Sequence, residues 1–407
     1  MKICLVSQTD LQSGEGHKKR LFQFVELFKS AFGPENLTWI CFIPVPLNTA
    51  KGFFHAIQRI RSLRASNRDS YSNFYPLFGF PRPFHNLLLQ VQASLFLRLK
   101  FFKRPPDIIW AEMTCSAFPA LPYKTSNRIP LIVDAHGIAE EHDLKAFQTE
   151  AKKELQVIHS ADGIVAVSEK MQIYFSDKYG PLRSTREVVP CVTDFQLYRF
   201  QKDERLRIRN AFKISNRLVF VYSGGLAAWQ GIDLYFEFVN FVFKAGPQLK
   251  TKPFFMFLTW VDDFSEIEKR FRELHLKPED WLVKRLPHEE VPSYLSAADV
   301  AVIFRSATNI NRVASPTKIG EYLACGLPLV MSAEIGDLSD FTKQNDLGIV
   351  IGASGSELQT LVNFLNSIQL DRDQQRARVT SLAEGYFGPH RFRKCIEMIH
   401  ELKKNTE

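Results

Sequence analysis

Residues 309–330, with the sequence NINRVASPTKIGEYLACGLPLV, carry the pattern that decides the fold prediction. The run before them, DVAVIF at 299–304, is short, apolar and rich in β-branched residues, as is typical of a buried parallel strand. The pattern predicts a helix over residues 318–325 that ends at Gly326, and a second strand over 327–331. A strand, a helix and a strand in this order indicate the parallel sheet of an α/β protein.

The start of the predicted helix has the features of an anion-binding site. Thr317 is the expected cap, and the free backbone N–H groups and positive dipole end of a helix start attract anions. Lys318 adds a full positive charge there. Glu321 lies one turn further on, where its carboxylate can accept two hydrogen bonds from neighbouring hydroxyl groups, such as those of a ribose. Phosphate and ribose together indicate a nucleotide, while an ordinary surface helix is the alternative that the spacing leaves open.

The segment SPTKIGEYLACGLPLV at 315–330 resembles the nucleotide-sugar signature of family 4 glycosyltransferases, which are retaining enzymes of the GT-B fold. This resemblance implies an α/β protein of two Rossmann-like, doubly wound domains, with the active site in the cleft between them. It also implies that Glu321 holds the ribose of the donor. The loop Ser315-Pro316-Thr317 would meet the diphosphate and the sugar.

Length and composition agree with a two-domain globular protein. The chain has 407 residues, of which 45% are hydrophobic and 24% charged. Its six cysteines are scattered without a CxxC pair, and its histidines do not cluster, so we expect reduced thiols, no metal site and no cofactor besides the donor. Met1 and Lys2 lead directly into a strand-like run, so no signal peptide is expected and the predicted location is the cytoplasm.

The amino-terminal segment predicts the first unit of a doubly wound domain. A strand-like run at 2–7 is followed by a loop containing Gly14-Glu15-Gly16 and by a helix with an apolar face. The loop lacks the third glycine of the dinucleotide fingerprint, which counts against a dehydrogenase. In the resembled family this loop lies near the donor phosphates and the acceptor, so the resemblance makes Gly16 a donor-binding candidate.

His136 is the catalytic candidate of the amino-terminal half. The run IPLIVDAHG at 129–137 takes a predicted buried strand into a turn. It resembles the DxHG segment of family 4 enzymes, whose histidine faces the donor sugar. Residues 161–170 and 189–194 match the family as well, the latter at its exit from the first domain.

The carboxy-terminal half repeats the strand–glycine loop–helix pattern with SGGLAAWQG at 223–231. Gly224 and Gly225 allow backbone N–H groups to approach a phosphate closely. The family commonly places an arginine and a lysine where this chain has Gly225 and Gln230.

We therefore expect the charge for the diphosphate to come from elsewhere, with Lys318 and Arg312 as the candidates. The resemblance assigns the loop that begins at Arg285 to the nucleotide base. Many members also carry a glutamate eight positions before the ribose-binding one, where this chain has Val313.

Residues 51–104 form a basic, aromatic insertion with ten basic residues and one acid, a net charge of +9 that exceeds the +8 of the whole chain. The apolar run at 87–102 is too short and too polar to span a bilayer. We expect an interfacial segment on an anionic membrane surface. Two helices that cover the sheet with a solvated basic face are one alternative. Nucleic acid is not expected as a partner, because no nucleic-acid module is present.

These observations predict an acceptor-side domain at 1–197, a nucleotide-sugar domain at 198–385 and a last helix at 386–407 that crosses back to the first domain. The charged segment 201–216 is the expected linker. The predicted function is a retaining, metal-independent, hexosyltransferase-like enzyme. It would use a nucleotide-sugar donor and a glycan or polyprenyl-linked acceptor, in the biosynthesis of capsule, exopolysaccharide or lipopolysaccharide, at the inner face of the cytoplasmic membrane.

Two other functions remain open at this point. A nucleotide-sugar epimerase of related fold would use the same donor site with added carboxylates, which Glu140 and Glu141 could supply. A non-catalytic scaffold is suggested by the charges that are missing at Gly225, Gln230 and Val313.

Overall fold

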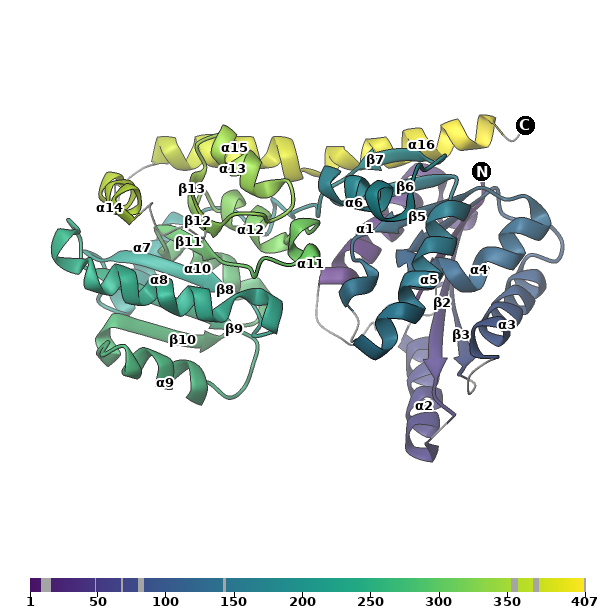
Figure 1. Cartoon of the computed structure of the whole chain (residues 1–407), viewed down its shortest axis with the longest axis horizontal. Helices are drawn as coiled ribbons and strands as arrows, with labels where there is room; N and C mark the ends of the chain where they lie inside the picture. The colour runs from purple at the N-terminus through teal and green to yellow at the C-terminus, as the bar shows by residue number, and fades with distance from the viewer. Residues whose placement is uncertain are drawn as a thin grey trace. The chain divides into compact units, whose positions relative to one another are not determined.

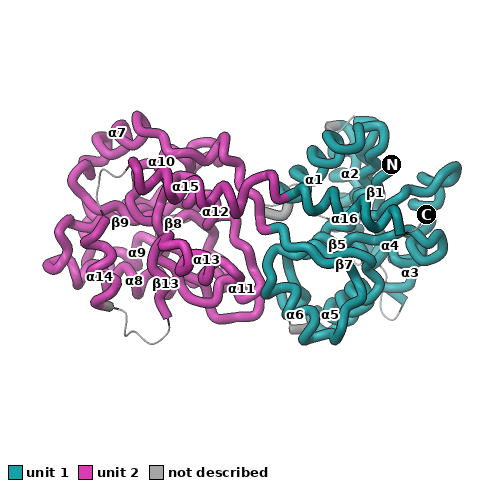
Figure 2. The backbone as a smooth tube through the Cα atoms, turned by 90° about the horizontal axis from the view of Figure 1, so that it is seen from above, with its two compact units in different colours: residues 1–189, 392–407 teal, residues 190–391 magenta. Residues whose placement is uncertain are grey.

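The computed structural model describes residues 1–8, 16–47, 49–66, 69–79, 84–141, 144–352, 358–368 and 373–405. The chain forms two compact units, drawn in teal and magenta in Figure 2. Unit 1 comprises Met1–Val189 with Phe392–Glu407, and unit 2 comprises Pro190–Arg391. The boundaries expected from the sequence, after residues 197 and 385, both lie inside unit 2.

Unit 1 is built on a parallel sheet with the strand order β3-β2-β1-β4-β5-β6-β7. Its strands are β1 (Ile3–Ser7), β2 (Leu37–Val45), β3 (Ser72–Phe78), β4 (Ile108–Glu112), β5 (Leu131–Ala135), β6 (Gly163–Ala166) and β7 (Thr185–Val188). Its helices are α1 (Gly16–Phe32), α2 (Ala50–Ser66), α3 (His85–Lys100), α4 (Met113–Asn127), α5 (Leu144–Ser160), α6 (Glu169–Tyr179) and α16 (Arg393–Lys404) (Figure 1).

Unit 2 contains a second parallel sheet with the order β10-β9-β8-β11-β12-β13. Its strands are β8 (Leu218–Ser223), β9 (Pro253–Thr259), β10 (Trp281–Arg285), β11 (Val300–Ile303), β12 (Leu329–Ser332) and β13 (Gly348–Ile351). Its helices are α7 (Lys202–Ala211), α8 (Ile232–Lys244), α9 (Ser265–Glu273), α10 (Val291–Ala297), α11 (Asn309–Arg312), α12 (Thr317–Ala324), α13 (Leu338–Gln344), α14 (Leu358–Ser367) and α15 (Asp373–Phe387).

Both strand orders are those of a doubly wound sheet, which confirms the predicted fold class. The winding reverses between β1 and β4 in unit 1 and between β8 and β11 in unit 2. The central strands are buried on both faces, as in LVFVYS of β8, because helices cover each side of a parallel sheet. In unit 2 two apolar clusters result, one including residues of α10, α12 and α15 and the other including residues of α8, α9 and α14. The strands predicted at 299–304 and 327–331 are confirmed as β11 and β12.

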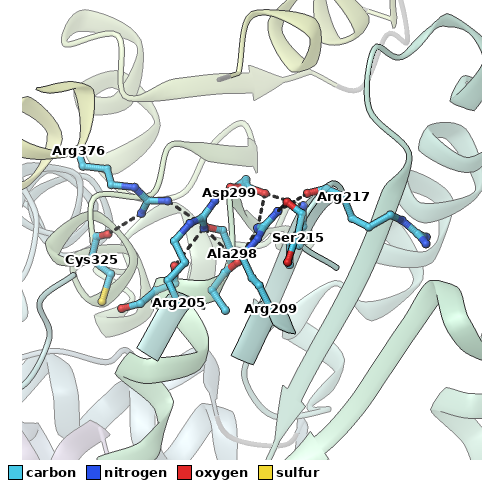
Figure 3. A network of polar contacts seen from close by, with 11 residues as sticks. Arg205, Arg209, Ser215, Arg217, Ala298, Asp299, Cys325 and Arg376 are labelled. Atoms are coloured by element: carbon cyan, nitrogen blue, oxygen red, sulfur yellow. Dashed lines mark hydrogen bonds and ion pairs between the residues drawn. The ribbon is translucent and has the colours of Figure 1, made fainter. Parts of the chain in front are cut away.

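A buried ionic network fastens α7 to the amino-terminal end of β11 (Figure 3). Asp299 is fully buried and lies 2.6 Å from Arg205 Nη2 and 2.9 Å from Arg209 Nη1. The same carboxylate accepts a hydrogen bond of 2.9 Å from the backbone N–H of Val219 in β8. Both arginines also donate to backbone carbonyl groups around the end of α10, so their charges are compensated although they are buried.

The network extends to α15 through Arg376, which donates to the carbonyl oxygens of Ala298 at 3.2 Å and Cys325 at 3.4 Å. The expectation of a linker at 201–216 is therefore wrong, because α7 is an integral helix of unit 2. The arginines of this segment are typical of a solvated stretch of sequence, but two of them are buried because they form ion pairs with Asp299. The last helix, α16, belongs to unit 1. Its Met398 and Leu402 pack against β6 and leave no room for a side chain at Gly163.

Candidate functional site

The main candidate site lies at the carboxyl ends of β8, β11 and β12 in unit 2, where the winding of the sheet reverses. Open α/β sheets bind ligands at this position because loops from neighbouring strands diverge there and leave a crevice. Three segments meet at this edge: the glycine loop at 223–231, the loop at 305–308 after β11, and the start of α12.

The start of α12 differs in one respect from the expectation. Thr317 is the first helical residue and Pro316 occupies the cap position, so the predicted capping by Thr317 is wrong. The nearby hydroxyl of Ser315 accepts a hydrogen bond of 3.2 Å from the backbone N–H of Cys191, which anchors the loop to the segment entering unit 2. In the described part of the chain no side chain caps α12, and of its first N–H groups that of Ile319 donates to the carbonyl of Pro316 at 3.1 Å. A helix start without a side-chain cap suits an anion.

The end of α12 follows the prediction. Gly326 has a φ of 71° and donates its N–H to Leu323, while the N–H of Leu327 bonds to the carbonyl of Tyr322. This pair of hydrogen bonds is the usual glycine-dependent termination of a helix, and it turns the chain directly into β12.

Tyr322 joins α12 to the glycine loop. Its hydroxyl oxygen lies 2.7 Å from the backbone nitrogen of Ser223, from which it accepts, and 3.2 Å from the carbonyl oxygen of the same residue. Burial raises the pKa of Tyr322 well above its usual range, so the hydroxyl keeps its proton and can make both bonds. The end of β8 and the helix start are thereby held together.

Glu321 lies in a hydrogen-bonded chain that the sequence does not reveal. Its side chain is 4% exposed, and one carboxylate oxygen lies 2.9 Å from Lys318 Nζ. The hydroxyl of Tyr198 donates to Glu321 and lies 3.1 Å from Nδ1 of His288. Because a carboxylate can only accept, the phenolic proton points to Glu321 and His288 carries its hydrogen on Nδ1. Burial and the charge of Glu321 raise the pKa of Tyr198, which keeps this donor protonated.

The three cations predicted for the donor site all have carboxylate partners. Lys318 is paired with Glu321, as described above. Arg312 in α11 lies 3.1 Å from Glu334, and both side chains are about half exposed. Arg285 ends the edge strand β10 and pairs with Asp262.

Gly224 and Gly225 begin the glycine loop. The N–H of Gly224 continues the sheet by donating to Leu258 at 3.0 Å, and the carbonyl of Gly225 accepts from the hydroxyl of Tyr222 at 2.7 Å. A Cβ at Gly225 would lie 3.0 Å from Nε1 of Trp260, which is tighter than most such contacts. The glycine therefore permits a close approach between this loop and the end of β9.

Asn311, another residue that sequence reasoning missed, links the loops on both sides of the site. Its buried amide donates to the carbonyl oxygens of Trp229 at 3.0 Å and Ser306 at 2.9 Å, and thus ties the glycine loop to the loop after β11. Val313, where the family often has a glutamate, is buried with 4% of its surface exposed.

Gly320 in α12 leads to a stability prediction. A Cβ on Gly320 would lie 2.1 Å from Thr193 Oγ1 and 3.2 Å from the ring of Phe387, so α12 packs here with no space for a methyl group. We expect Gly320→Ala to lower the free energy of unfolding by about 1–3 kcal/mol, as overpacked cores do, in urea titrations.

Thr193→Ala provides the matched control, because it removes the atom that the new methyl group would meet. Thr193 Oγ1 is buried and has no hydrogen-bond partner among the described residues, so this change alone should cost little. In the Thr193→Ala background Gly320→Ala should lose most of its effect. Equal costs in both backgrounds would contradict this explanation of the glycine.

His136 lies at the carboxyl edge of unit 1, directly after β5. Its Nδ1 is 3.2 Å from Asp134 Oδ2, and Arg20 of α1 binds the same carboxylate through its guanidinium at 2.6 to 3.1 Å. Burial opposes ionisation of Asp134, but the charge of Arg20 and the hydrogen bonds from His136 and Arg20 hold its pKa at about 2. Asp134 is therefore ionised, and Nδ1 of His136 must carry a hydrogen.

Two further residues adjoin His136 and were missed by sequence reasoning. Glu112 ends β4, and its Oε1 lies 3.9 Å from Nε2 of His136 with both side chains nearly buried. The next residue, Met113, has a φ of 67°, a conformation that is strained in a residue other than glycine and recurs at functional sites. The residue after His136 is Gly137. A Cβ there would lie 2.7 Å from Met113 Cε and from Glu141 Oε1, so the backbone at Gly137 packs directly against these two side chains.

The remaining candidates of unit 1 are two glutamates that accept hydrogen bonds from neighbouring groups and a glycine at the limit of the described residues. Glu140 accepts from the hydroxyl of Tyr174 at 3.0 Å, and Glu141 accepts from the N–H of Ile138 at 3.2 Å. Gly16 is the first residue of α1, and the loop before it lies outside the described residues.

Within the described ranges, no group of three or more histidine, cysteine, aspartate or glutamate side chains is arranged to hold a metal ion. In the same part of the chain, no helix is long and apolar enough to cross a membrane.

The sequence matches the family model for Glycosyltransferase Family 4 over residues 58–197. No curated protein sequence matches the chain at a significant level. Among solved structures, HepE of Anabaena in complex with UDP is similar over 100% of this chain and 99% of its own, with 15% identity and a TM-score of 0.69.

Two other similar structures have comparable coverage. Sucrose-phosphate synthase from Thermosynechococcus elongatus covers 100% of this chain and 98% of its own, with 15% identity and a TM-score of 0.61. WaaG, a glycosyltransferase involved in lipopolysaccharide biosynthesis, covers 98% and 99%, with 12% identity and a TM-score of 0.64. The predicted resemblance to family 4 glycosyltransferases is confirmed by the match over residues 58–197, and the predicted GT-B fold by the two doubly wound units.

Proposed function

We propose that this protein is a retaining glycosyltransferase that moves a sugar from a nucleotide-sugar to a glycan or polyprenyl-linked acceptor of a cell-surface polysaccharide, such as capsule, exopolysaccharide or lipopolysaccharide. One observation carries the proposal. A buried carboxylate, Glu321, is held by Lys318 and Tyr198 at the place where doubly wound sheets bind nucleotides. A preoriented carboxylate beside a helix start suits a ribose with an attached diphosphate. HepE, which shares the fold, is solved with UDP and with UDP-glucose, so uridine nucleotide-sugars are the first donors to test.

In the proposed reaction the bond between the anomeric carbon and the diphosphate oxygen breaks, and a bond from the acceptor oxygen to that carbon forms on the same face. The proton of the acceptor hydroxyl passes to the departing diphosphate. The protein must stabilise the negative charge on this leaving group and the positive charge at the anomeric carbon. The N–H groups of α12, Lys318 and the glycine loop serve the first need. His136 of unit 1 contacts the departing sugar, and no metal or further cofactor takes part.

The experiment is incubation with a panel of UDP-, GDP-, ADP- and dTDP-sugars, with and without a polyprenyl-diphosphate-linked glycan acceptor. We expect release of a nucleoside diphosphate only with acceptor, and a product whose anomeric configuration by NMR is that of the donor. A sugar altered without acceptor would identify an epimerase, and binding without either reaction would identify a scaffold. Glu140 and Glu141 are engaged in hydrogen bonds within unit 1, which gives the epimerase no support.

We propose further that α3 docks the protein on an anionic membrane surface, where a lipid-linked acceptor would be found. Ala93 and Leu97 of this helix are buried, but a second stripe of apolar side chains is 54–66% exposed. The stripe consists of Leu87, Val91, Leu95 and Leu99, with Phe84 and Phe102 exposed at its ends. Their spacing of four residues places them on one side of the helix.

Basic side chains at the carboxyl end of α3 make the surface complementary to anionic lipid. Arg98, Lys100, Lys103 and Arg104 are all exposed. Each basic residue near such a surface contributes about 1 kcal/mol, and buried apolar side chains add to this attraction. Arg64 is a less suitable contact, since its guanidinium binds the carbonyl of Phe74, and Arg68 and Arg82 lie outside the described residues.

Vesicle sedimentation tests the role of the stripe. The pair Leu95→Gln and Leu99→Gln should weaken binding to vesicles with anionic lipid at least about tenfold, because each removes an apolar side chain that would insert. Leu206→Gln with Ile173→Gln is the matched control, since these side chains are 54% and 57% exposed on other helices. Raised salt should release the native protein. Equal pelleting of all variants, or equal binding to neutral vesicles at every salt concentration, would leave α3 as a solvated covering helix.

A further inference from the structure

Arg305 is a cation at the reversal point of unit 2 that none of the sequence patterns singled out. It is the second residue after β11, and its backbone is fixed by Ser332, whose hydroxyl oxygen lies 2.9 Å from Arg305 N and 3.3 Å from Arg305 O. The side chain is partly buried. Its Nε atom is fully buried and has no hydrogen-bond partner in the described part of the chain.

Two tyrosines locate this guanidinium beside the glycine loop. Arg305 interacts electrostatically with Tyr222 and Tyr322. Tyr222 donates its hydroxyl proton to the carbonyl of Gly225, and Tyr322 bonds to the backbone of Ser223. Both phenol groups are neutral, because burial raises their pKa values, so neither supplies a negative charge to Arg305.

The other cations of this edge differ from Arg305 in one respect. Lys318, Arg312 and Arg285 each pair with a carboxylate of unit 2. For Arg305 no carboxylate lies within ion-pair distance among the residues that the structure describes. The buried Nε atom of Arg305 meets neither water nor a partner among the described residues, and burial lowers the pKa of the guanidinium. A desolvated charge without a partner costs several kcal/mol, so an anion that arrives with a ligand would stabilise it.

We infer that Arg305 binds the diphosphate of the donor and supplies the charge that the family loop commonly carries at the positions of Gly225 and Gln230. This inference rests on the proposed function. A guanidinium offers a planar fork of donors that fits two phosphate oxygens at once, and in a site with little water each such bond is strengthened. Asn311 fixes the loops on both sides of Arg305, so the cation is positioned before the ligand arrives. In the reaction it would stabilise the diphosphate as it leaves.

Calorimetry with the intact chain tests the inference. The nucleoside diphosphate that binds best among UDP, GDP, ADP and dTDP is compared with its free nucleoside. Arg305→Gln should lower the affinity for the diphosphate by about ten- to hundredfold, as expected for the loss of hydrogen bonds from a charged group. The affinity for the free nucleoside should stay within about twofold of the native value. Arg305→Lys should recover part of the loss. Arg272→Gln is the matched control, since it removes an exposed cation of α9 that pairs with Glu268 at 3.3 Å and has no place in the proposed site, and it should change affinity less than threefold.

The melting temperature distinguishes a ligand-binding arginine from a structural one, because replacing a structural arginine would lower it. Without ligand, Arg305→Gln should leave the melting temperature unchanged or raise it, because it removes an uncompensated charge. A lower melting temperature with unchanged diphosphate affinity would overturn the inference and make Arg305 a packing residue. Diphosphate binding that does not depend on Arg305 would overturn the inference alone. If no nucleoside diphosphate binds the native chain, the proposed function fails. Stabilisation by inorganic pyrophosphate that Arg305→Gln abolishes would then still support the anion site.

Discussion

Replacing Glu321 by glutamine is expected to weaken the binding of a ribonucleoside diphosphate by about ten- to hundredfold. A ribose that donates two hydroxyl hydrogens to a carboxylate forms charge-assisted hydrogen bonds. Hydrogen bonds to charged groups contribute about 1.5–3 kcal/mol each, more than those to a neutral amide. Glutamine keeps the size of the side chain, so the packing of α12 should survive. Isothermal titration calorimetry measures the loss directly.

The ligand itself provides the control for this prediction. A nucleoside diphosphate without 2′- and 3′-hydroxyl groups cannot use the carboxylate, so Glu321→Gln should bind it at least as tightly as the native protein does. Lys318 would lose its partner at 2.9 Å in the variant, and this freed cation could strengthen the hold on phosphate. The ribose assignment is wrong if both ligands lose affinity to the same degree.

Tyr198→Phe should reproduce a small part of the effect, because it removes the donor that orients Glu321 without touching the ligand. Tyr198 lies between the exit from unit 1 and α7, far in the sequence from Glu321. An aromatic residue in such a segment carries no signal of its own. Only the folded chain shows that its hydroxyl reaches both Glu321 and His288.

The elements around the site were predictable because their signals are local. The apolar run at 299–304, the glycine at 326 and the apolar run at 327–331 define a strand, a helix end and a second strand without any distant contact. The capping of α12 was not predictable in the same way. Thr317 is the first helical residue rather than the cap, and the loop before it is held by a hydrogen bond from the N–H of Cys191 to the hydroxyl of Ser315, a partner 124 residues away.

Charged residues were harder to interpret than apolar ones, because the partner decides whether a charge is buried or solvated. Arg205 and Arg209 resemble a solvated linker in the sequence, yet Asp299 holds both in the interior. Arg305 shows the reverse difficulty. It follows a strand like any loop arginine, and its unusual feature is a missing partner, which only the three-dimensional arrangement reveals.

His136→Ala is expected to lower turnover by about 10²–10³-fold while donor affinity changes less than threefold. The proposed contact of His136 is with the sugar as it departs, so its loss should appear in kcat rather than in binding. A loss of this size is usual when one preoriented polar group at a developing charge is removed. Asp134 fixes the ring through Nδ1, and Arg20 fixes Asp134 in turn, so the orientation of His136 does not depend on the ligand.

Because the side chain of His136 is only 4% exposed, the same change should also lower stability, and the two effects must be separated. Trp39→Phe serves this purpose. It breaks the 2.9 Å hydrogen bond from Trp39 Nε1 to Ser7 in the same unit and leaves His136 in place. Both variants are assayed well below their melting temperatures. Turnover that falls equally in the two variants would attribute the loss to stability, and unchanged turnover in His136→Ala would make His136 a packing residue. A loss confined to His136→Ala, with the donor still bound, places the histidine at the reacting sugar.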